Sequence, residues 1–490
     1  MPPINADKID MDGEKGRTID TSKCIRKLSN LERMYLWSPY SDVSMVTRIN
    51  GNVSEERIRS ALDVILQMHP LVGAKVVFDE NYNAWFSTGN VIKPFFKTVN
   101  RVSDTQWLDE LQHEITIPFN PETGPMIRFI LVHSEMVSDL VVICNHSICD
   151  GMSLVYLIRD LLNSYTNPEQ EIKVINPVDI MDFLPKGGFS LQSVMMKLII
   201  GHANRKWEKN PYYFDHKDAV AIQEAYWEKY KFNTVLLELE PSQTKDLLKK
   251  CRNKGVSIGS AVIAAFIAAH EDIVGPFVKN QKQLWVPFDL RRHATTPIDD
   301  VFCLCMGAPQ LSYTYKAKKP FWENAAVLHN EIHKKVQKLD SNTIETPNSH
   351  PTLMDALSSF ALLKEIVPDA YDKTENLKQY SHDTRNITFS FAKRSKTMAP
   401  GAIPSNLGGL GIPETYGNLQ IDRMIFFPVI SDTVALDIGG VSIGDKSVFS
   451  LSYLKPKNQD NSMTKEMIQI RNNALEYLGF PDKVSEKVMK

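Results

Sequence analysis

The sequence predicts a mixed α/β fold in which mixed sheets are backed by helices and the chain is divided into two lobes. Strand and helix patterns alternate irregularly and are interrupted by hairpins, which favours layered mixed sheets over a regular parallel wind. A chain of 490 residues is too long for one ordinary hydrophobic core. Its 43% hydrophobic and 23% charged residues are typical of a globular protein.

We expect four regions along the chain. They are a mobile tail over residues 1–20, an N-terminal lobe over 21–165, a crossover over 166–230 and a C-terminal lobe over 231–490. The tail is polar and charged, and residues 166–215 lose clear periodicity apart from one helical stretch.

The first elements follow from local patterns. Residues 44–51 form a strand pattern that ends at an Asn-Gly turn. Residues 54–70 show apolar positions at helical spacing, with Ser54 as the N-cap and Pro70 as the stop. Residues 71–89 then predict a hairpin.

The rest of the first lobe leads to the main motif. Residues 103–119 carry a helical apolar stripe, and the β-branched and aromatic residues of 126–134 and 138–146 predict two strands. Residues 151–165 form an amphipathic helix pattern, and 191–207 form another within the crossover.

The second half restarts the alternation. Residues 233–255 predict a strand, a turn and a helix, and 257–273 predict a buried, alanine-rich helix. Residues 283–293 predict a strand with an arginine-rich end, and 462–480 a closing helix. The other expected strands span residues 386–393, 423–430, 433–441 and 447–454.

Charge and cysteine usage exclude several classes of protein. The net charge of -2 disfavours extended nucleic-acid binding, which needs a basic excess. No stretch approaches the roughly 18 consecutive apolar residues of a membrane span, so we expect at most peripheral membrane contact. Six scattered cysteines and a polar N-terminus predict a cytoplasmic protein with free thiols, and we expect a monomer.

The stretch "CNHSICDG", residues 144–151, has three interpretations. Its first interpretation is a metal site, since zinc accepts thiolate and imidazole ligands, but the spacing is not that of a paired zinc motif. Its second is a core strand that ends in an ordinary, hydrogen-bonded histidine. The candidate zinc ligands are Cys144, His146, Cys149, Cys303 and Cys305.

The third interpretation is general base catalysis by His146. A neutral imidazole takes a proton from a hydroxyl or amine while that group attacks a carbonyl. Asp150 either orients the imidazole or pairs with an arginine such as Arg291, which follows an apolar run in the other half of the chain. Gly151 allows another group to approach the backbone closely.

Several segments, in the right order, resemble the superfamily of CoA-dependent acyltransferases. This superfamily includes chloramphenicol acetyltransferase, the condensation domains of nonribosomal peptide synthetases, fungal alcohol acetyltransferases and polyketide-associated acyltransferases. The motif H-x-x-x-D-G in "NHSICDG" matches its catalytic motif, "PFDLRRH" its arginine segment and "PSNLGGLGIPETYGNL" its S-N-L-G turn. The segments "LSNLERMYLW", "ALDVILQMHPLVGAKV" and "PFNPETGPMIRFILV" resemble the family's first lobe.

The resemblance implies two chloramphenicol acetyltransferase-like lobes around a central channel. His146 is then the general base for transfer of an acyl group from a thioester to an alcohol, without a covalent enzyme intermediate. Asp150 pairs structurally with Arg291, and Gly151 packs tightly or offers its N–H. Asn406 either shapes the channel or only builds the turn before Gly408.

The resemblance leaves the substrates open. Acyl-CoA is expected as a co-substrate, with no permanently bound cofactor and no metal; an acyl carrier protein is the alternative donor. Condensation domains often carry two consecutive histidines, and here the first is Asn145, which makes amide formation less favoured. The remaining alternatives are an N-acyltransferase, a stand-alone condensation enzyme and a catalytically silent acyl-binding module.

Two basic stretches are candidates for binding. Lys393, Arg394 and Lys396 offer cations for the phosphates of coenzyme A, or they belong to a solvated loop. The helix over 191–207 carries basic residues beside an apolar stripe, which suits contact with lipid and a lipidic alcohol acceptor, or packing on its own lobe. Its notable residues are Met195, Lys197, Leu198, Ile199, Arg205, Lys206 and Trp207.

Overall fold

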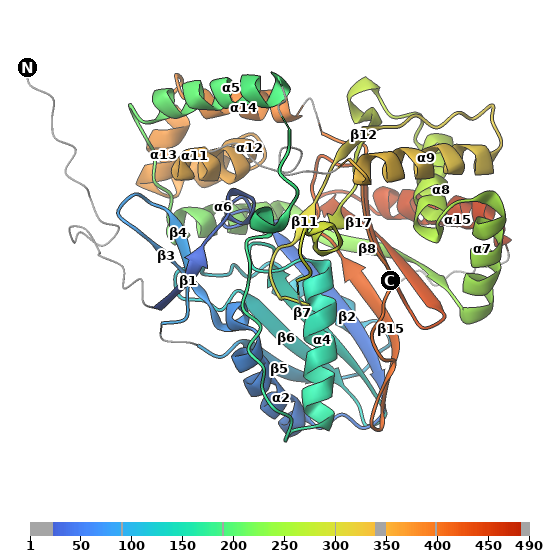
Figure 1. Ribbon diagram of the computed structural model, residues 1–490. Helices are drawn as coiled ribbons and strands as arrows, with labels where there is room; N and C mark the ends of the chain where they lie inside the picture. Colours follow the sequence, from blue (N-terminus) through green and yellow to red (C-terminus); the bar gives the residue numbers. More distant parts are fainter. Residues whose placement is uncertain are drawn as a thin grey trace, which may run out of the picture.

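The computed structural model describes residues 23–89, 92–188, 191–298, 300–338, 349–396 and 399–481. Two six-stranded sheets dominate it, both sheets mix parallel and antiparallel pairs, and helices pack against them (Figure 1). This architecture confirms the mixed α/β fold that the sequence predicts. The expected tail over residues 1–20 lies outside the described residues.

The first sheet has the strand order β14-β15-β2-β7-β6-β5, and only its β5 and β6 pair in parallel. Two of its strands, β14 and β15, come from residues 415–427, which the sequence places in the C-terminal lobe. The division at residue 231 therefore does not describe sheet membership. The strands are β2 (Asp42–Asn50), β5 (Phe95–Asn100), β6 (Ile127–His133), β7 (Val137–Asn145), β14 (Thr415–Tyr416) and β15 (Leu419–Phe427).

The second sheet has the strand order β12-β9-β13-β16-β17-β8, and its β13 is parallel to both neighbours. The predicted strands over 433–441 and 447–454 are present in it as the antiparallel neighbours β16 and β17. The strands are β8 (Tyr230–Leu239), β9 (Gln283–Trp285), β12 (Gln310–Ser312), β13 (Ala402–Gly409), β16 (Leu436–Ile443) and β17 (Lys446–Pro456).

Helices follow the apolar stripes predicted for them. In the first lobe α2 packs against α4, and in the second lobe the apolar helix α8 packs against α15 and α9. Among the described residues no single helix is long and apolar enough to cross a membrane, although α7 and α8 together, bent by 93°, satisfy length and composition. The helices are α2 (Glu55–Met68), α3 (Gln106–Glu114), α4 (Gly151–Thr166), α7 (Pro241–Lys254), α8 (Ile258–Ile273), α9 (Phe321–Val336) and α15 (Ser462–Leu478).

Helices from two distant stretches, residues 191–229 and 351–396, gather at one end of the molecule (Figure 1). We call this group the helical cap. Arg33 joins it to the first lobe through two bonds to Asp355, of 2.8 and 2.6 Å. The cap contains α5 (Leu191–Trp207), α6 (His216–Lys229), α11 (Pro351–Asp355), the π-helix η6 (Ala356–Phe360), α12 (Ala361–Leu363), α13 (Glu375–His382) and α14 (Ile387–Lys396).

The strand predicted over residues 386–393 is wrong, because these residues form α14. The side chain of Asn386 accepts a hydrogen bond from the backbone N–H of Thr388 at 3.0 Å, which caps the start of the helix. Phe389 packs on Tyr380 with ring centroids 4.9 Å apart. Capping and packing here outweigh the strand propensity of a β-branched and aromatic run.

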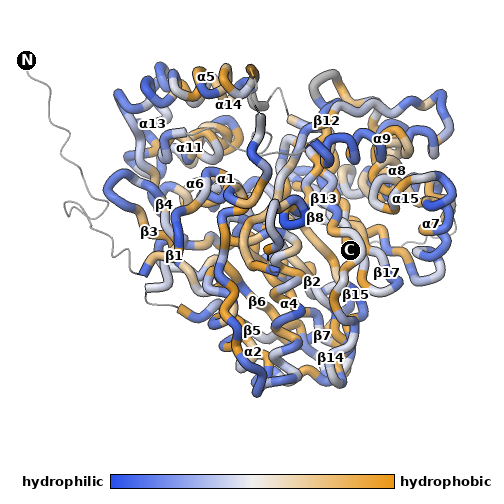
Figure 2. The backbone as a smooth tube through the Cα atoms, in the orientation of Figure 1, coloured by the Kyte–Doolittle hydropathy of each residue, from blue (hydrophilic) through white to orange (hydrophobic). Residues whose placement is uncertain are grey.

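The remaining elements are short. The predicted hairpin over 71–89 is present as the antiparallel pair β3 and β4, and β1 extends it. Figure 2 shows that apolar positions concentrate in the strands, where the core lies. These elements are β1 (Cys24–Lys27), α1 (Asn30–Arg33), β3 (Lys75–Phe78), β4 (Ala84–Ser87), β10 (Phe288–Asp289), β11 (Met306–Gly307) and the 3-10 turns Pro70–Gly73, Ile180–Phe183, Lys279–Lys282, Leu290–His293 and Pro368–Asp372.

Candidate active site

The H-x-x-x-D-G stretch forms a tight turn between the end of β7 and the start of α4. Asn145, the last residue of β7, holds this turn, because its side-chain oxygen accepts hydrogen bonds from the N–H and the hydroxyl of Ser147 at 3.1 and 2.6 Å. The backbone N–H of His146 donates to the carbonyl of Ser41 at 2.8 Å. An asparagine at position 145 therefore has a structural role in presenting the histidine.

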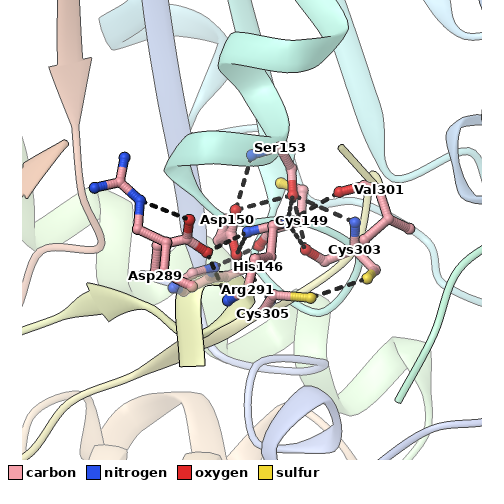
Figure 3. Close-up of polar contacts among 10 residues, drawn as sticks. His146, Cys149, Asp150, Ser153, Asp289, Arg291, Val301, Cys303 and Cys305 are labelled. Atoms are coloured by element: carbon pink, nitrogen blue, oxygen red, sulfur yellow. Dashed lines mark hydrogen bonds and ion pairs between the residues drawn. The ribbon is translucent and has the colours of Figure 1, made fainter. Parts of the chain in front are cut away.

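The imidazole of His146 is held in one tautomer. Its Nδ1 lies 2.7 Å from the carbonyl oxygen of Cys149, and a carbonyl only accepts, so Nδ1 carries the proton (Figure 3). Nε2 then carries the lone pair that a general base needs. Burial lowers the pKa of His146, against smaller raising effects of the Cys149 carbonyl and Asp150, which favours the neutral imidazole.

Asp150 is fully engaged by hydrogen-bond donors. Its Oδ1 accepts from the N–H and the hydroxyl of Ser153 at 2.8 and 2.9 Å, so it caps α4. Its Oδ2 accepts from Arg291 Nη1 at 2.9 Å and from the Cys305 N–H at 2.8 Å (Figure 3). Burial raises the pKa of Asp150, but the charge of Arg291 and these hydrogen bonds outweigh it and lower the pKa overall.

Arg291 ties the turn to the second half of the chain. Besides Asp150 it binds Asp289 at 3.0 Å, the hydroxyl of Ser153 at 2.9 Å and the carbonyls of Val301 and Cys303 at 2.9 and 3.0 Å. Its side chain is 5% exposed, as is that of Asp150, so the pair is a buried one. This network keeps Asp150 directed at Arg291, while the imidazole of His146 is hydrogen-bonded to the Cys149 carbonyl.

Gly151 is required by close packing. A Cβ atom at this position would lie 2.8 Å from Leu407 Cδ2 and 2.8 Å from Phe426 Cζ, which is too close for a real contact. Leu407 lies on β13 and Phe426 on β15. The start of α4 therefore fits against strands from the second half of the chain only without a side chain.

His146 lines a cavity of about 680 Å³ that is bordered by both lobes and the helical cap. Tyr35 also lines it and packs its ring on the imidazole, with centroids 4.4 Å apart. Most of the lining is apolar; representative side chains are Val43, Met152, Leu357, Leu362, Phe426 and Val429. The cavity is the space in which a reacting group meets the histidine.

Asn406 lines the same cavity and also builds its own turn. Its Oδ1 accepts from the Gly408 N–H at 3.1 Å. The side-chain amide of Asn406 lies between the backbones of two glycines. A Cβ atom added at Gly259 would lie 2.1 Å from Asn406 Nδ2, and one added at Gly440 would lie 2.6 Å from Asn406 Oδ1. Both interpretations of Asn406, as a wall of the channel and as a turn residue, are thus compatible with its position.

The predicted basic cluster lies apart from the cavity. Lys393 and Arg394 are exposed on α14, in the helical cap, and neither is among the residues that line the cavity. The side chain of Lys396 lies outside the described residues. Their role in binding coenzyme A stays a prediction.

The metal interpretation gains no support from the geometry. Among the described residues, no group of three or more His, Cys, Asp or Glu side chains is arranged to hold a metal ion. The thiols of Cys144 and Cys149 lie 3.6 and 3.7 Å from the carbonyl oxygen of Asn145, and those of Cys303 and Cys305 lie 3.3 Å from each other.

Ser41 is a site residue that sequence reasoning missed. It directly precedes β2 and lies beside His146, because Asp42 pairs with Asn145 in the sheet. Ser41 lines the cavity, and its hydroxyl is buried with no hydrogen-bond partner among the described residues. Only the pairing register of β2 and β7 reveals this neighbour, and no local sequence signal gives it.

Comparison with known proteins agrees with this geometry. Residues 90–296, which include His146, Asp150, Gly151 and Arg291, match the family model described as alcohol acetyltransferase. No curated protein sequence matches the chain significantly.

Solved structures share the fold over almost the whole chain. A trichothecene 15-O-acetyltransferase, TRI3, from Fusarium sporotrichioides is 13% identical, with a TM-score of 0.60 and 97% and 100% of the two chains covered. Polyketide synthase associated protein 5 from Mycobacterium tuberculosis is 14% identical, with a TM-score of 0.56 and 93% and 98% covered. The starter condensation domain of rhizomide synthetase, solved with C8-CoA and Leu-SNAC, is 9% identical, with a TM-score of 0.54 and 95% and 96% covered.

These matches confirm the resemblance drawn from the motifs and support acyl transfer in general. The chain has the two-lobed fold of the chloramphenicol acetyltransferase-like and condensation-domain superfamily, and its residues 90–296 match the alcohol acetyltransferase family within it.

Proposed function

We propose that the protein is an O-acyltransferase that moves an acyl group from an acyl-CoA thioester to an alcohol. The observation that carries the proposal is the state of His146. Its Nδ1 proton is held by the Cys149 carbonyl at 2.7 Å, its pKa is lowered by burial, and it lines a cavity of about 680 Å³. A neutral imidazole with a fixed tautomer beside an apolar chamber is suited to general base catalysis.

The proposed reaction needs no covalent intermediate on the enzyme. His146 Nε2 takes the proton of the acceptor hydroxyl as its oxygen attacks the thioester carbonyl. The tetrahedral intermediate then collapses, the carbon–sulfur bond breaks, and the imidazolium returns its proton to the leaving thiolate. The products are an ester and free thiol, and the imidazole is neutral again.

Ser41 is proposed to donate a hydrogen bond to the oxyanion of that intermediate. Its hydroxyl is buried, unpartnered among the described residues and next to His146 along the β2–β7 pairing. A buried donor without a partner costs free energy, so a ligand oxygen that accepts its proton would recover that cost.

The apolar lining supports a lipidic or aromatic acceptor or a long acyl chain. Leu357, Leu362 and Val429 border the cavity together with Phe426. A structure of the same fold was solved with C8-CoA, which supports coenzyme A as the donor's thiol, taken up as a co-substrate. An acyl carrier protein is the alternative donor.

The test measures thiol release from acetyl-CoA and longer acyl-CoA donors with panels of alcohols and of amines. His146→Ala is expected to lower kcat/KM by about 10²- to 10⁴-fold, the usual contribution of a general base. Because burial lowers the pKa of His146, the acid limb of the pH profile should lie below the ordinary value of 6.5.

His382→Ala is the matched control, since His382 is exposed on α13, outside the cavity. Its activity should equal that of the wild type, and thermal melts should show that all variants fold. Unchanged acceptor-dependent release in His146→Ala would remove His146 as the base. Acceleration by amines and not by alcohols would replace the O-acyltransferase with an N-acyltransferase.

Ser41→Ala removes one hydroxyl and leaves the backbone bond to His146 in place. If Ser41 serves the oxyanion, kcat should fall by about 10²-fold while KM stays nearly unchanged, as for other donors of this kind. A change confined to KM would show instead that Ser41 binds the ground state of a substrate.

A further inference from the structure

Helix α5 (Leu191–Trp207) exposes an apolar face on the outside of the helical cap. Leu191, Met195 and Leu198 are 78%, 59% and 69% exposed, and their spacing of four and three residues places them on one side of the helix. Figure 2 shows apolar positions along this outer helix. Six of the seventeen large apolar side chains that are exposed among the described residues lie here: Leu191, Val194, Met195, Met196, Leu198 and Ile199.

The C-terminal half of α5 packs against the rest of the cap on its opposite face. Ala203 and Trp207 are 1% and 2% exposed, and the indole N–H of Trp207 donates to the hydroxyl of Thr352 at 2.9 Å. Asn204 accepts from the backbone N–H of His350 at 2.9 Å. The exposed face is therefore a fixed feature of the folded cap, since the helix that carries it is bound to α11.

Cations outnumber carboxylates around this face, and the exposed Asp182 and Glu208 border the stretch at its two ends. Residues 183–207 contain no aspartate or glutamate, although the whole chain has a net charge of -2. Lys197, Arg205 and Lys206 are exposed on α5, and Lys186 is exposed just before it. Apolar side chains flanked mainly by cations are complementary to a surface that is apolar below and anionic at its boundary.

We propose that α5 docks the protein on an anionic phospholipid bilayer. Leu191, Met195 and Leu198 enter the boundary between headgroups and acyl chains, while Arg205 and Lys206, on the C-terminal turn, bind lipid phosphates. These long apolar side chains are exposed on an outer helix of the cap, which suits insertion into a deformable bilayer.

The docking face is connected to the cavity by packing. α5 packs on α14, α14 packs on α12 and η6, and residues of η6 and α12 line the cavity. A bilayer against α5 would therefore lie on the cap side of the cavity. An acceptor dissolved in that bilayer would then be near the cavity. The docking itself does not depend on the proposed function.

The test is flotation of the full chain with phosphatidylcholine vesicles, with and without phosphatidylserine. The wild type should float with the anionic vesicles. Met195→Asp with Leu198→Asp should lower the bound fraction by about tenfold or more, because the apolar anchor is lost. Arg205→Glu with Lys206→Glu should weaken binding by roughly fivefold per cation and remove its dependence on phosphatidylserine.

Val102→Asp is the matched control, because Val102 is 84% exposed and lies in the first lobe, away from α5. It should bind like the wild type. Thermal melts verify that each variant is folded. If the Met195→Asp, Leu198→Asp variant has a lower melting temperature than the wild type, the charge-reversal variant, which alters only exposed cations, decides the outcome. No acyl substrate is needed, so failure of the proposed function would leave this result unaffected.

Three results would overturn the proposal. The first is a wild type that does not float with anionic vesicles. The second is a loss of vesicle binding in Val102→Asp that equals the loss in the α5 variants. The third is light scattering that shows a dimer broken by the α5 substitutions, because α5 would then be covered by a second copy of the chain.

Discussion

Asp150 and Asp437 are both buried, one in the first lobe and one in the second, and their pKa values are shifted in opposite directions. They are 4% and 1% exposed. Asp150 receives four hydrogen bonds, one of them from Arg291, and its pKa is lowered. Asp437 accepts a hydrogen bond from the Ser431 N–H at 3.2 Å, and its Oδ1 has no partner among the described residues. Burial raises its pKa well above the usual value.

At these two positions the partners account for the opposite pKa directions, since both carboxyls are buried. Desolvation opposes the charge of both residues. At the turn after β7 the guanidinium of Arg291 more than offsets it, so the carboxylate persists and joins two halves of the chain. At the start of β16 no cation among the described residues does so, and Asp437 favours the protonated form.

The largest effect is expected from Asp150→Asn. This change leaves Arg291 buried with only Asp289 as an anionic partner, and removing one member of a buried pair typically costs about 3–5 kcal/mol. Urea unfolding measures the loss. Because the pKa of Asp150 is lowered by folding, the wild type's advantage should disappear as the pH falls through the folded pKa, below 3.8.

Asp445→Asn provides the matched control for this substitution. Asp445 pairs with Lys245 on the surface at 2.8 Å, with both side chains more than half exposed. Removing this surface ion pair should lower the free energy of unfolding by no more than about 0.5 kcal/mol. An equally small effect of Asp150→Asn would show that the pair with Arg291 contributes little to stability.

A smaller effect of opposite sign is expected from Asp437→Asn. At pH 7 the unfolded chain ionises Asp437 readily while the folded protein opposes its charge, so the wild type has a penalty that asparagine lacks. The variant should therefore be more stable than the wild type at pH 7, and urea unfolding measures the difference.

The pH profile sharpens this comparison. Folding raises the pKa of Asp437, so its contribution to stability is fully present below 3.8 and is lost as the pH rises through the folded pKa. The difference between the variant and the wild type should therefore grow as the pH rises above 3.8 toward the folded pKa of Asp437. If Asp437→Asn is destabilising at every pH, Asp437 is ionised in the fold and the comparison fails.

Much of the fold could be predicted because it depends on local patterns. The helix over 54–70, the hairpin over 71–89 and the apolar helix over 257–273 follow from caps, turns and spacing. The strand predicted over 386–393 failed because packing on Tyr380 and the Asn386 cap are tertiary facts. The entry of residues 415–427 into the first sheet is a choice of partner strand that no local pattern encodes.

The candidate site divides in the same way. His146, Asp150 and Gly151 belong to one contiguous motif, and Arg291 follows an apolar run that marks it as a strand end. Ser41 and Tyr35 meet the histidine only through strand register and the fold of the segment before β2. No sequence pattern predicts the protonation state of Asp437 either, because that state depends on the absence of a cationic partner among the described residues around it.

The path of β15 has a consequence for biosynthesis. Its strand covers the outer edge of β2, and an uncovered strand edge is a template for pairing with other chains. Since proteins emerge from the ribosome N-terminus first, β2 is synthesised well before residues 419–427, which pair with it. The segment that supplies Leu407 and Phe426 to Gly151 arrives equally late, so a nascent chain released early would be both inactive and prone to aggregate.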